Sequence, residues 1–310
     1  MPSAKTRKTV AVRGAAPVAS PKRMAGELVL HGIRITHPDR VVSETGRLTK
    51  RDLAEYYAAV APLMLPAIAH HPLSLLRCPS GIDDHSCFFQ RAPGRGLGPD
   101  VFPFHFANKG KTYEYLYIKD EKGLIELVQM GSVEIHPWGA RVDGIDHPER
   151  MIFDLDPAPE LSFDAVKLAA RDLRQRLQGK GLESTLKCTG GKGLHVTVPL
   201  AGKDEWARVK SFAASVVEEM IADVPAAYVA AMAKVKRTGK IFLDYFRNDY
   251  TATTIADYSV RARAGVPVAL PLDWDELEGL KSASQFTVDG ALERIRKRKP
   301  PQSPTPQRLP

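Results

Sequence analysis

Apolar residues recur along this chain with two spacings, one typical of helices and the other of strands. Residues 49–52 (TKRD) have the composition of a capping box, and an apolar stripe at helical spacing follows them. Two similar stripes predict a helix capped by Ser162 and another that begins near Asp204. The three stripes consist of Leu53, Tyr56, Tyr57, Val60 and Met64; of Val166, Ala169, Ala170, Leu173 and Leu177; and of Trp206, Val209, Phe212, Ala213, Val216 and Met220.

Shorter runs that alternate or are wholly apolar predict strands. These runs lie at 112–119, 124–128, 133–136, 151–153, 194–198 and 241–243. Because helices and strands follow each other in mixed order, the sequence predicts an α+β (mixed α/β) domain.

Composition adds limits on the class of protein. The chain has 310 residues, of which 44% are hydrophobic, so it can bury a large core. Its net charge of +8 favours polyanionic partners. We find no 18-residue apolar stretch and no secretory signal at the start, and so expect a cytoplasmic, nucleoid-associated protein without membrane contact. Cys78, Cys87 and Cys188 are odd in number and lack Cys-x-x-Cys spacing, which favours reduced thiols.

The two ends differ in composition from the middle. Residues 1–26 are basic and rich in Ala and Pro, and we predict a flexible arm there. Residues 27–298 form the predicted catalytic domain, and the Pro-rich segment 299–310 is predicted to be a tail or linker. For both ends, a solvated segment without function stands beside an auxiliary role in DNA contact or tethering.

Three aspartates follow or interrupt apolar runs. Asp154 and Asp156 share one face if 151–156 is a strand, while Phe153 and Leu155 point into the core. Asp244 follows a second apolar run about ninety residues later. Crowded carboxylates repel each other unless a divalent cation neutralises them, as in metal-dependent phosphoryl- or nucleotidyl-transfer sites. The alternative is a simple turn, since Asp-x-Asp-Pro is common where a strand ends.

A glycine-rich turn, TGGKGLH at 189–195, lies between two predicted strands. Glycines let a backbone approach an anion closely, and Lys192 adds a positive charge. The spacing is not that of a Walker A loop, and a strand follows instead of a helix. Alone, such a segment is more often a simple hairpin, with its histidine, His195, at the surface. Next to an acidic metal site, phosphate binding becomes the better interpretation.

Other basic and aromatic residues are weaker candidates. Arg247 and Arg261 have the bidentate fork that suits phosphate, although salt bridges with nearby acids are the common alternative. His136 is either a packed histidine or a phosphate donor. Phe88 and Phe89 stand beside a polar, Gly- and Pro-rich stretch and could stack on bases, although paired aromatics more often lie in a core.

Seven short motifs together carry a resemblance to a known family. They are THPDR (36–40), EIHPW (134–138), FDLDP (153–157), GGKGLHV (190–196), LDY (243–245), YSVRAR (258–263) and PLDWDEL (271–277). In this order they resemble the polymerase domain of bacterial DNA ligase D, of the archaeo-eukaryotic primase superfamily, which works in non-homologous end joining. The resemblance covers about residues 28–298. It implies a primase-type core of β-sheets flanked by helices, with an RRM-like C-terminal half.

The resemblance also implies roles for individual residues. Asp154, Asp156 and Asp244 match the carboxylates that hold two Mn²⁺ or Mg²⁺ ions. The residues implied around the incoming triphosphate are His136, Thr189, Lys192, His195, Arg247 and Arg261. Arg40 and Lys50 match a pair that grips a 5′-phosphate, and Phe88 and Phe89 match aromatics that stack on template bases. The chain departs from the family pattern at Thr189, where serine is usual, and in 248–253, which is usually glycine-rich.

The function implied is template-directed nucleotide transfer, with NTPs preferred over dNTPs, at gaps and ends of double-stranded DNA that carry a 5′-phosphate. Ligase and phosphoesterase domains, in this or another chain, and a Ku-type end-binding protein are the implied partners. Two other functions stay open: a DNA-end-binding module without catalytic activity, and a primase that starts chains de novo. A two-metal nuclease would leave the glycine–lysine–histidine turn without a triphosphate.

Overall fold

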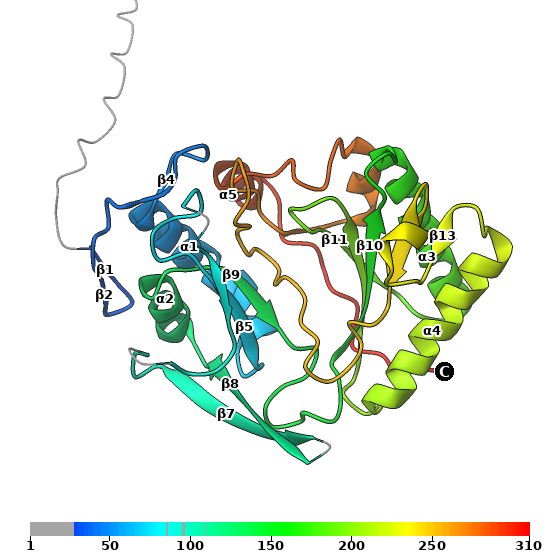
Figure 1. Ribbon diagram of the computed structural model, residues 1–310, viewed down its shortest axis with the longest axis horizontal. Coiled ribbons are helices and arrows are strands. Elements are labelled where there is room, and N and C mark those ends of the chain that lie inside the picture. Colours follow the sequence, from blue (N-terminus) through cyan, green and yellow to red (C-terminus); the bar gives the residue numbers. More distant parts are fainter. Residues whose placement is uncertain (1–27, 85, 95–96, 109) are drawn as a thin grey trace, which may run out of the picture.

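Two β-sheets stand side by side in this computed structural model, each with helices on one face (Figure 1). The structure describes residues 28–310 except 85, 95–96 and 109, so the predicted arm at 1–26 lies outside the described residues. The mixed α and β content confirms the predicted fold class.

The N-terminal half is built on a five-stranded sheet with strand order β6-β5-β8-β7. The fifth strand, β9, pairs with β5 along its whole length, from Leu73 to Arg77. Helices α1 (Lys50–Ile68) and α2 (Glu121–Gln129) pack together against this sheet (Figure 1). The strands are β5 Leu73–Arg77, β6 Phe88–Gln90, β7 Val101–Asn108, β8 Lys111–Ile118 and β9 Ser132–Pro137. Two small hairpins precede α1: β1 Leu28–Leu30 with β2 Ile33–Ile35, and β3 Val41–Ser43 with β4 Leu48–Thr49.

The C-terminal half has a six-stranded sheet of order β13-β14-β10-β12-β11-β15. Its central part runs β10-α3-β11-β12-α4-β14 along the chain, with β14, β10, β12 and β11 adjacent and antiparallel. This is the split βαβ arrangement of RRM-like domains, as predicted. The elements are β10 Arg150–Pro157, α3 Phe163–Gly179, β11 Thr185–Cys188, β12 Leu194–Pro199, α4 Trp206–Asp223, β13 Tyr228–Val229, η1 Lys234–Arg237, β14 Ile241–Asp244, β15 Leu270–Leu272, η2 Trp274–Gly279 and α5 Val288–Lys297.

One apolar core runs through both halves, and the predicted stripes supply much of it. Phe153 and Leu155 are fully buried, as the alternation along β10 predicts, so the aspartates between them lie on the opposite face of the sheet. Of the residues in the three predicted helical stripes, Phe212 alone is only partly buried. Burial of these side chains is the main source of stability that holds the two sheets in place.

Helix starts were predicted with mixed success. Thr49 and Asp52 form the expected capping box at the start of α1. Ser162 occupies the N-cap of α3 but its side chain makes no capping hydrogen bond. The prediction of a strand at 124–128 is wrong, because this apolar run lies in α2, where the Asp120 side chain caps the helix by accepting from Gly123 N. A short apolar run alone does not separate a buried strand from a buried helix.

The C-terminal segment 299–310 packs on the domain. Gln307 forms a parallel bridge with Leu200, and its side chain bonds to the backbone of Glu183 at both N and O. Leu309 is buried, and its N–H donates to Asp204. The end of the Pro-rich segment is therefore docked on the domain through Gln307 and Leu309.

The reduced state predicted for the cysteines is wrong for two of them. Cys78 and Cys87 form a disulfide, with Cα atoms 4.3 Å apart, and Cys188 is a buried free thiol. Arg77 in β5 pairs with Phe88 in β6, so the two cysteines are the next residues outward on paired strands. Sequence spacing did not reveal this pairing because it depends on the hairpin register. No helix in the described part of the chain is long and apolar enough to cross a membrane.

Candidate active site

The registers of four neighbouring strands bring four polar side chains into one row. On the sheet, Lys187 of β11 lies opposite His195 of β12, His195 opposite Asp154 of β10, and Asp154 opposite Asp244 of β14. Residues directly opposite each other on adjacent strands share a face. Their strand neighbours Leu155, Leu194 and Leu243 therefore fill the helix-covered side. The row faces away from α3 and α4.

Asp156 lies two residues further along β10, on the same face as Asp154. Asp154, Asp156 and Asp244, the carboxylate triad, thus converge as predicted. His195 Nε2 lies 3.5 Å from Asp154 Oδ1, and Arg247 Nε lies 3.0 Å from Asp244 Oδ2. Asp244 also accepts the backbone N–H of Phe246. Each of these partners lies on the face that the triad presents.

Crowding and burial change the acidity of the carboxylate triad. Burial, together with the neighbouring Asp154 and Asp244, raises the pKa of Asp156 to about 6. Burial also raises the pKa of Asp244, against the opposing effect of Arg247. The pKa of Asp154 is lowered despite its burial, because His195 stabilises the charged form. The triad therefore carries more negative charge than its protein surroundings compensate.

This donor set fits a hard divalent cation. Mg²⁺ and Mn²⁺ prefer carboxylate oxygens, and a bound cation would remove the repulsion that raises the Asp156 pKa. The residues that would hold the ion or ions are Asp154, Asp156 and Asp244, with Arg247 leaving its ion pair to Asp244.

The glycine turn wraps closely around the end of β10. A Cβ on Gly193 would lie 2.1 Å from Leu155 O, so only glycine allows the turn to approach the strand this closely. The Thr189 hydroxyl donates to Gly193 O at 2.8 Å and accepts from Gly191 N at 3.2 Å. Thr189 therefore shapes the turn from within, and Lys192 is exposed at its tip.

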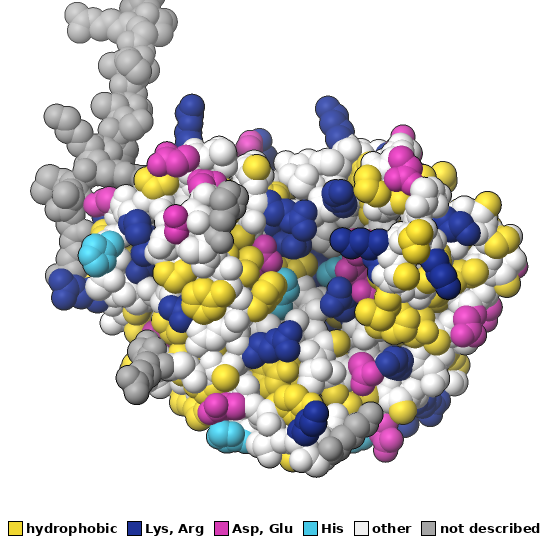
Figure 2. Space-filling model, viewed as in Figure 1, with side chains coloured by type: hydrophobic (Ala, Val, Ile, Leu, Met, Phe, Trp, Pro, Cys, Tyr) yellow, Lys and Arg dark blue, Asp and Glu magenta, His cyan; other side chains and the backbone are white. Residues whose placement is uncertain are grey.

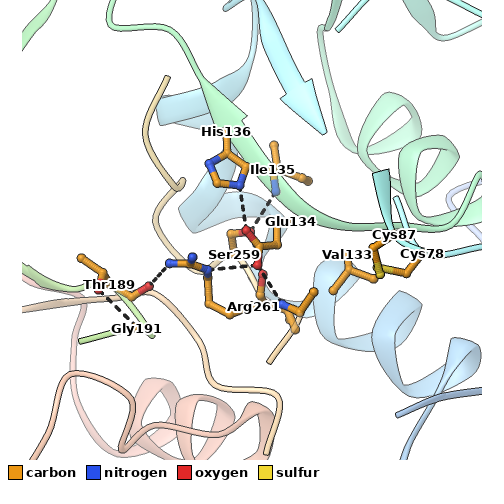
Figure 3. Close-up of polar contacts among 12 residues, drawn as sticks. Cys78, Cys87, Val133, Glu134, Ile135, His136, Thr189, Gly191, Ser259 and Arg261 are labelled. Atoms are coloured by element: carbon orange, nitrogen blue, oxygen red, sulfur yellow. Dashed lines mark hydrogen bonds and ion pairs between the residues drawn. A yellow bond between two sulfur atoms is a disulfide. The ribbon is translucent and has the colours of Figure 1, made fainter. Parts of the chain in front are cut away.

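The opposite wall of the site comes from the N-terminal half. His136 of β9 holds its Nε2 2.8 Å from Glu134 Oε2, and Glu134 Oε1 lies 3.1 Å from Arg261 Nε (Figure 3). Arg261 also donates from Nη1 to Thr189 O at 2.7 Å. Glu134 therefore links the predicted residues His136 and Arg261, and Arg261 in turn reaches Thr189. The sequence assigned no role to Glu134. Its position two residues before His136 in a predicted strand places both on one face and was the available signal.

Between these walls lies a cavity of about 380 Å³, the central cavity. Figure 2 shows Lys and Arg side chains gathered around a hollow in the middle of this face, with acidic and His side chains within it. Its lining includes all six residues predicted around the triphosphate, together with Asp154 and Asp156. Arg263, which forms a basic pair with Arg261 in the sequence, also lines the cavity. The sequence did not predict a place there for Arg91 or for residues 253–255.

Phe88 and Phe89 project at the rim. They are 45% and 60% exposed, so the core alternative does not describe them. The Phe89 ring lies edge-on to His136, with centroids 5.7 Å apart, and Arg77 lies over the Phe88 ring. Exposed rings supported from behind by a cation are suited to stacking on bases.

Arg40 and Lys50 lie near each other at the start of α1, but they differ in availability. Lys50 is only 3% exposed, and its ammonium donates to Thr36 O, Gln129 O and Gln129 Oε1 at 2.8–3.0 Å. Burial and the adjacent Arg40 lower the pKa of Lys50 to about 8. Arg40 Nε is buried without a hydrogen-bond partner among the described residues. An anion at this point would relieve the repulsion between the two cations.

Comparison with known proteins identifies the family to which this arrangement corresponds. A profile of the "LigD, primase-polymerase domain" matches residues 49–302, most of the chain. The chain belongs to the LigD primase-polymerase domain family. The match includes the carboxylate triad, the glycine turn and the Glu134–His136–Arg261 group, while Arg40 precedes it.

Individual relatives agree. The chain is 36% identical over 264 residues to the multifunctional non-homologous end joining protein LigD of Pseudomonas aeruginosa, and 32% identical over 265 residues to the LigD of Mycolicibacterium smegmatis. Each match covers 85% of this chain but only 31% and 34% of the relative, so the chain spans about a third of their length. A solved polymerase domain of Mycobacterium tuberculosis ligase D in complex with DNA is similar at a TM-score of 0.80, with 29% identity, covering 86% of this chain and 96% of that one.

The segment after Asp244, which the resemblance predicts to be glycine-rich, has a structural role in this protein. Asn248 is buried, its Oδ1 accepts from Ile152 N, and its Nδ2 donates to Ile152 O. Asp249 pairs with Lys210 of α4. The departure therefore fastens the end of β14 to β10 and α4, next to the triad.

Proposed function

We propose that this domain is a template-directed nucleotidyltransferase that adds nucleotides to a primer 3′-end at gaps and ends of broken DNA. The observation that carries the proposal is a cavity lined by Asp154, Asp156 and cationic side chains, with Asp244 opposite Asp154 on the neighbouring strand. Acidic groups on one wall and basic groups on the other suit a metal-bound nucleoside triphosphate. Membership of the LigD primase-polymerase family supports the same reaction class.

Two divalent ions, Mn²⁺ or Mg²⁺, held by Asp154, Asp156 and Asp244 would supply activation of the primer 3′-hydroxyl and charge neutralisation on the triphosphate. The residues of this chain do the rest. Lys192, Arg247 and Arg261 bind the phosphates, since guanidinium and ammonium groups form charge-assisted hydrogen bonds with them. His195, fixed beside Asp154, is placed to donate to the same phosphates.

Two side chains set the position of the sugar and base. His136 lies on the wall opposite the triad, and Phe89 lies edge-on to it, so both face a nucleotide in the cavity. Attack of the primer 3′-oxygen on the α-phosphorus forms one P–O bond and breaks the bond to pyrophosphate. The cationic side chains offset the charge that develops on the leaving group.

The DNA-facing assignments concern the N-terminal half. Phe88 and Phe89 stack on template bases, and Arg40 with Lys50 binds the 5′-phosphate of the downstream strand. For Lys50 this requires that a phosphate oxygen replaces one of its present acceptors, and the Gln129 side chain is the replaceable one. The name of a LigD relative, a multifunctional non-homologous end joining protein, supports a role in that repair process. Ligase and phosphoesterase domains and a Ku-type protein are the partners that we propose for it.

A preference for ribonucleotides is a separate part of the proposal. A cavity group that hydrogen-bonds the 2′-hydroxyl would be left unpaired by a dNTP, which is costly. The lining offers neutral hydrogen-bonding side chains for such a contact, among them His136, Ser74 and Thr253.

Single-nucleotide extension of a primer across a short gap with a downstream 5′-phosphate tests the proposal. With Mn²⁺, we expect extension by the wild-type protein, faster with NTPs than with dNTPs, and none by Asp154→Ala/Asp156→Ala. Extension by that variant at the wild-type rate would refute the assignment of the triad.

Two further outcomes would replace the proposal by another function. Tight phosphate-dependent DNA binding without extension would show an end-binding module. Product formed on a template without any primer would show a de novo primase.

A further inference from the structure

Glu134 is a buried carboxylate with three partners, two of which line the central cavity. Its side chain is 5% exposed and does not itself line the cavity. Oε2 meets His136 Nε2, while Oε1 accepts from Ala262 N at 2.8 Å and lies 3.1 Å from Arg261 Nε (Figure 3). Burial alone would raise the Glu134 pKa, but His136 and Arg261 outweigh it and hold the value at about 2. The carboxylate is therefore ionised at neutral pH.

Glu134 and its partners come from different parts of the fold. Glu134 and His136 belong to β9 in the N-terminal half, whereas Arg261 lies in the loop that precedes β15 in the C-terminal half. Backbone contacts fasten this loop to β9: Ile135 N donates to Ser259 Oγ at 3.0 Å, and Ala256 N donates to Ile135 O at 2.9 Å. Glu134 is therefore held in a fixed place relative to both halves.

The contacts of Glu134 fix the orientation of the His136 ring and of the Arg261 guanidinium. A carboxylate accepts hydrogen bonds, so the His136 nitrogen that faces it, Nε2, carries the proton, and Nδ1 is left free to act as an acceptor. Arg261 forms an ion pair with Glu134 across 3.1 Å from Nε, an atom without a hydrogen bond to the described residues, and donates from Nη1 to Thr189 O. Its guanidinium therefore spans the gap between β9 and the glycine turn. Without Glu134, two basic side chains would face each other in a buried wall.

We infer that Glu134 is a positioning residue, which sets the His136 tautomer and the Arg261 direction needed to receive the incoming nucleotide. The inference rests on the proposed function, because it assigns Glu134 a role in that same nucleotide pocket. Glu134 touches no nucleotide itself and acts through the two side chains that do.

The direct test is Glu134→Gln in the full chain, with Glu126→Gln as the matched control. Glu126 is equally buried and accepts one backbone N–H, from Asp100, but has no part in the central cavity. In Glu134→Gln the amide NH₂ opposes a donor on His136 or Arg261. We expect the nucleotide KM to rise about tenfold or more, with gapped-DNA affinity near wild type. The melting temperature should fall, because Arg261 loses its buried counter-charge.

A background that lacks both partners separates positioning from mere structure. In His136→Ala/Arg261→Ala protein, adding Glu134→Gln should change the nucleotide KM by less than about twofold, because the groups that it orients are gone. A tenfold rise in that background, or an unchanged KM in Glu134→Gln alone, would overturn the inference. Wild-type extension in the same assay shows whether the proposed function itself holds.

A measurement on the wild-type protein keeps the inference testable if Glu134→Gln does not fold. Nitrogen-15 NMR of the histidine side chains, with His136 assigned from a His136→Gln sample, reports which ring nitrogen carries the proton. We expect the Nε2–H tautomer at pH 8. An Nδ1–H tautomer would contradict the inference.

Discussion

Two groups of acidic side chains stand in the C-terminal half, and they differ in how their charge is compensated. Among the described residues, the ligand atoms of Asp273, Asp275 and Glu276, the acidic turn, are the one set of three acidic, His or Cys groups within 4.8 Å of one another. The carboxylate triad is spread more widely, across β10 and β14.

The acidic turn already uses its charge within the protein. Asp273 and Glu276 form the capping box of η2, and Glu276 pairs with Arg294 and Arg298. These contacts lower the Glu276 pKa in spite of partial burial, whereas the Asp156 pKa rises to about 6. Closeness of carboxylates is therefore a weaker guide to a cation site than charge that the protein leaves uncompensated.

The largest effect should come from neutralising one member of the triad. Asp244→Asn keeps the shape and the acceptor for Phe246 N but removes a charge. We expect primer extension to fall at least about a hundredfold, since the reaction loses a cation ligand. Asp275→Asn in the acidic turn should extend primers at the wild-type rate. Equal losses in steady-state extension would erase the distinction between the groups.

Stability should change in opposite directions in the two groups. In EDTA, Asp156→Asn relieves repulsion from Asp154 and Asp244 and should raise the free energy of unfolding by about 2 kcal/mol. Glu276→Gln leaves the buried Arg294 without its counter-charge and should lower the free energy of unfolding by a similar amount. Urea unfolding at pH 7.5 measures both. Destabilisation by Asp156→Asn would show that the triad is balanced without a cation.

The pH dependence sharpens the same point. The folded-state pKa of Asp156, about 6, lies above the ordinary 3.8, so its favourable contribution is complete below about pH 4 and is lost as the pH rises through 6. The stability advantage of Asp156→Asn in EDTA should therefore grow between pH 4 and pH 6 and then level off, at about 2 kcal/mol. With excess Mn²⁺ in place of EDTA, the wild-type protein should be more stable than Asp156→Asn. A flat difference across this range would contradict the raised pKa.

The smallest effect concerns the cation pair at α1. Arg40→Ala should lower the preference for 5′-phosphorylated over unphosphorylated gaps by about fivefold, without loss of stability. Lys50→Ala should weaken the same preference and also lower the melting temperature, because three acceptors lose their buried donor. Fluorescence anisotropy on both gapped duplexes, with thermal melts, separates the two. Lys50→Ala with the wild-type preference would limit Lys50 to a structural role.

How far the sequence predicted this site depends on strand register. Alternation along β10 placed Asp154 and Asp156 on one face, and the order of motifs led to the family, so the triad and six residues of the central cavity could be named. The burial of Lys50 was not predictable, because its acceptor Gln129 is distant in sequence. The Cys78–Cys87 pair and the docking of Gln307 depend on contacts that composition does not encode. Glu134 was only partly predictable. Strand periodicity places it on the same face as His136, but its link to Arg261 depends on the tertiary structure.

Mn²⁺ binding to the protein alone tests the central claim most directly. Electron paramagnetic resonance of free Mn²⁺ during titration gives the number of ions bound and their affinity, without DNA or turnover. We predict binding by the wild-type protein and by Asp273→Asn, and its loss in Asp154→Ala/Asp156→Ala. Binding that survives in the double variant and disappears in Asp273→Asn would place the cation at the acidic turn and contradict the account.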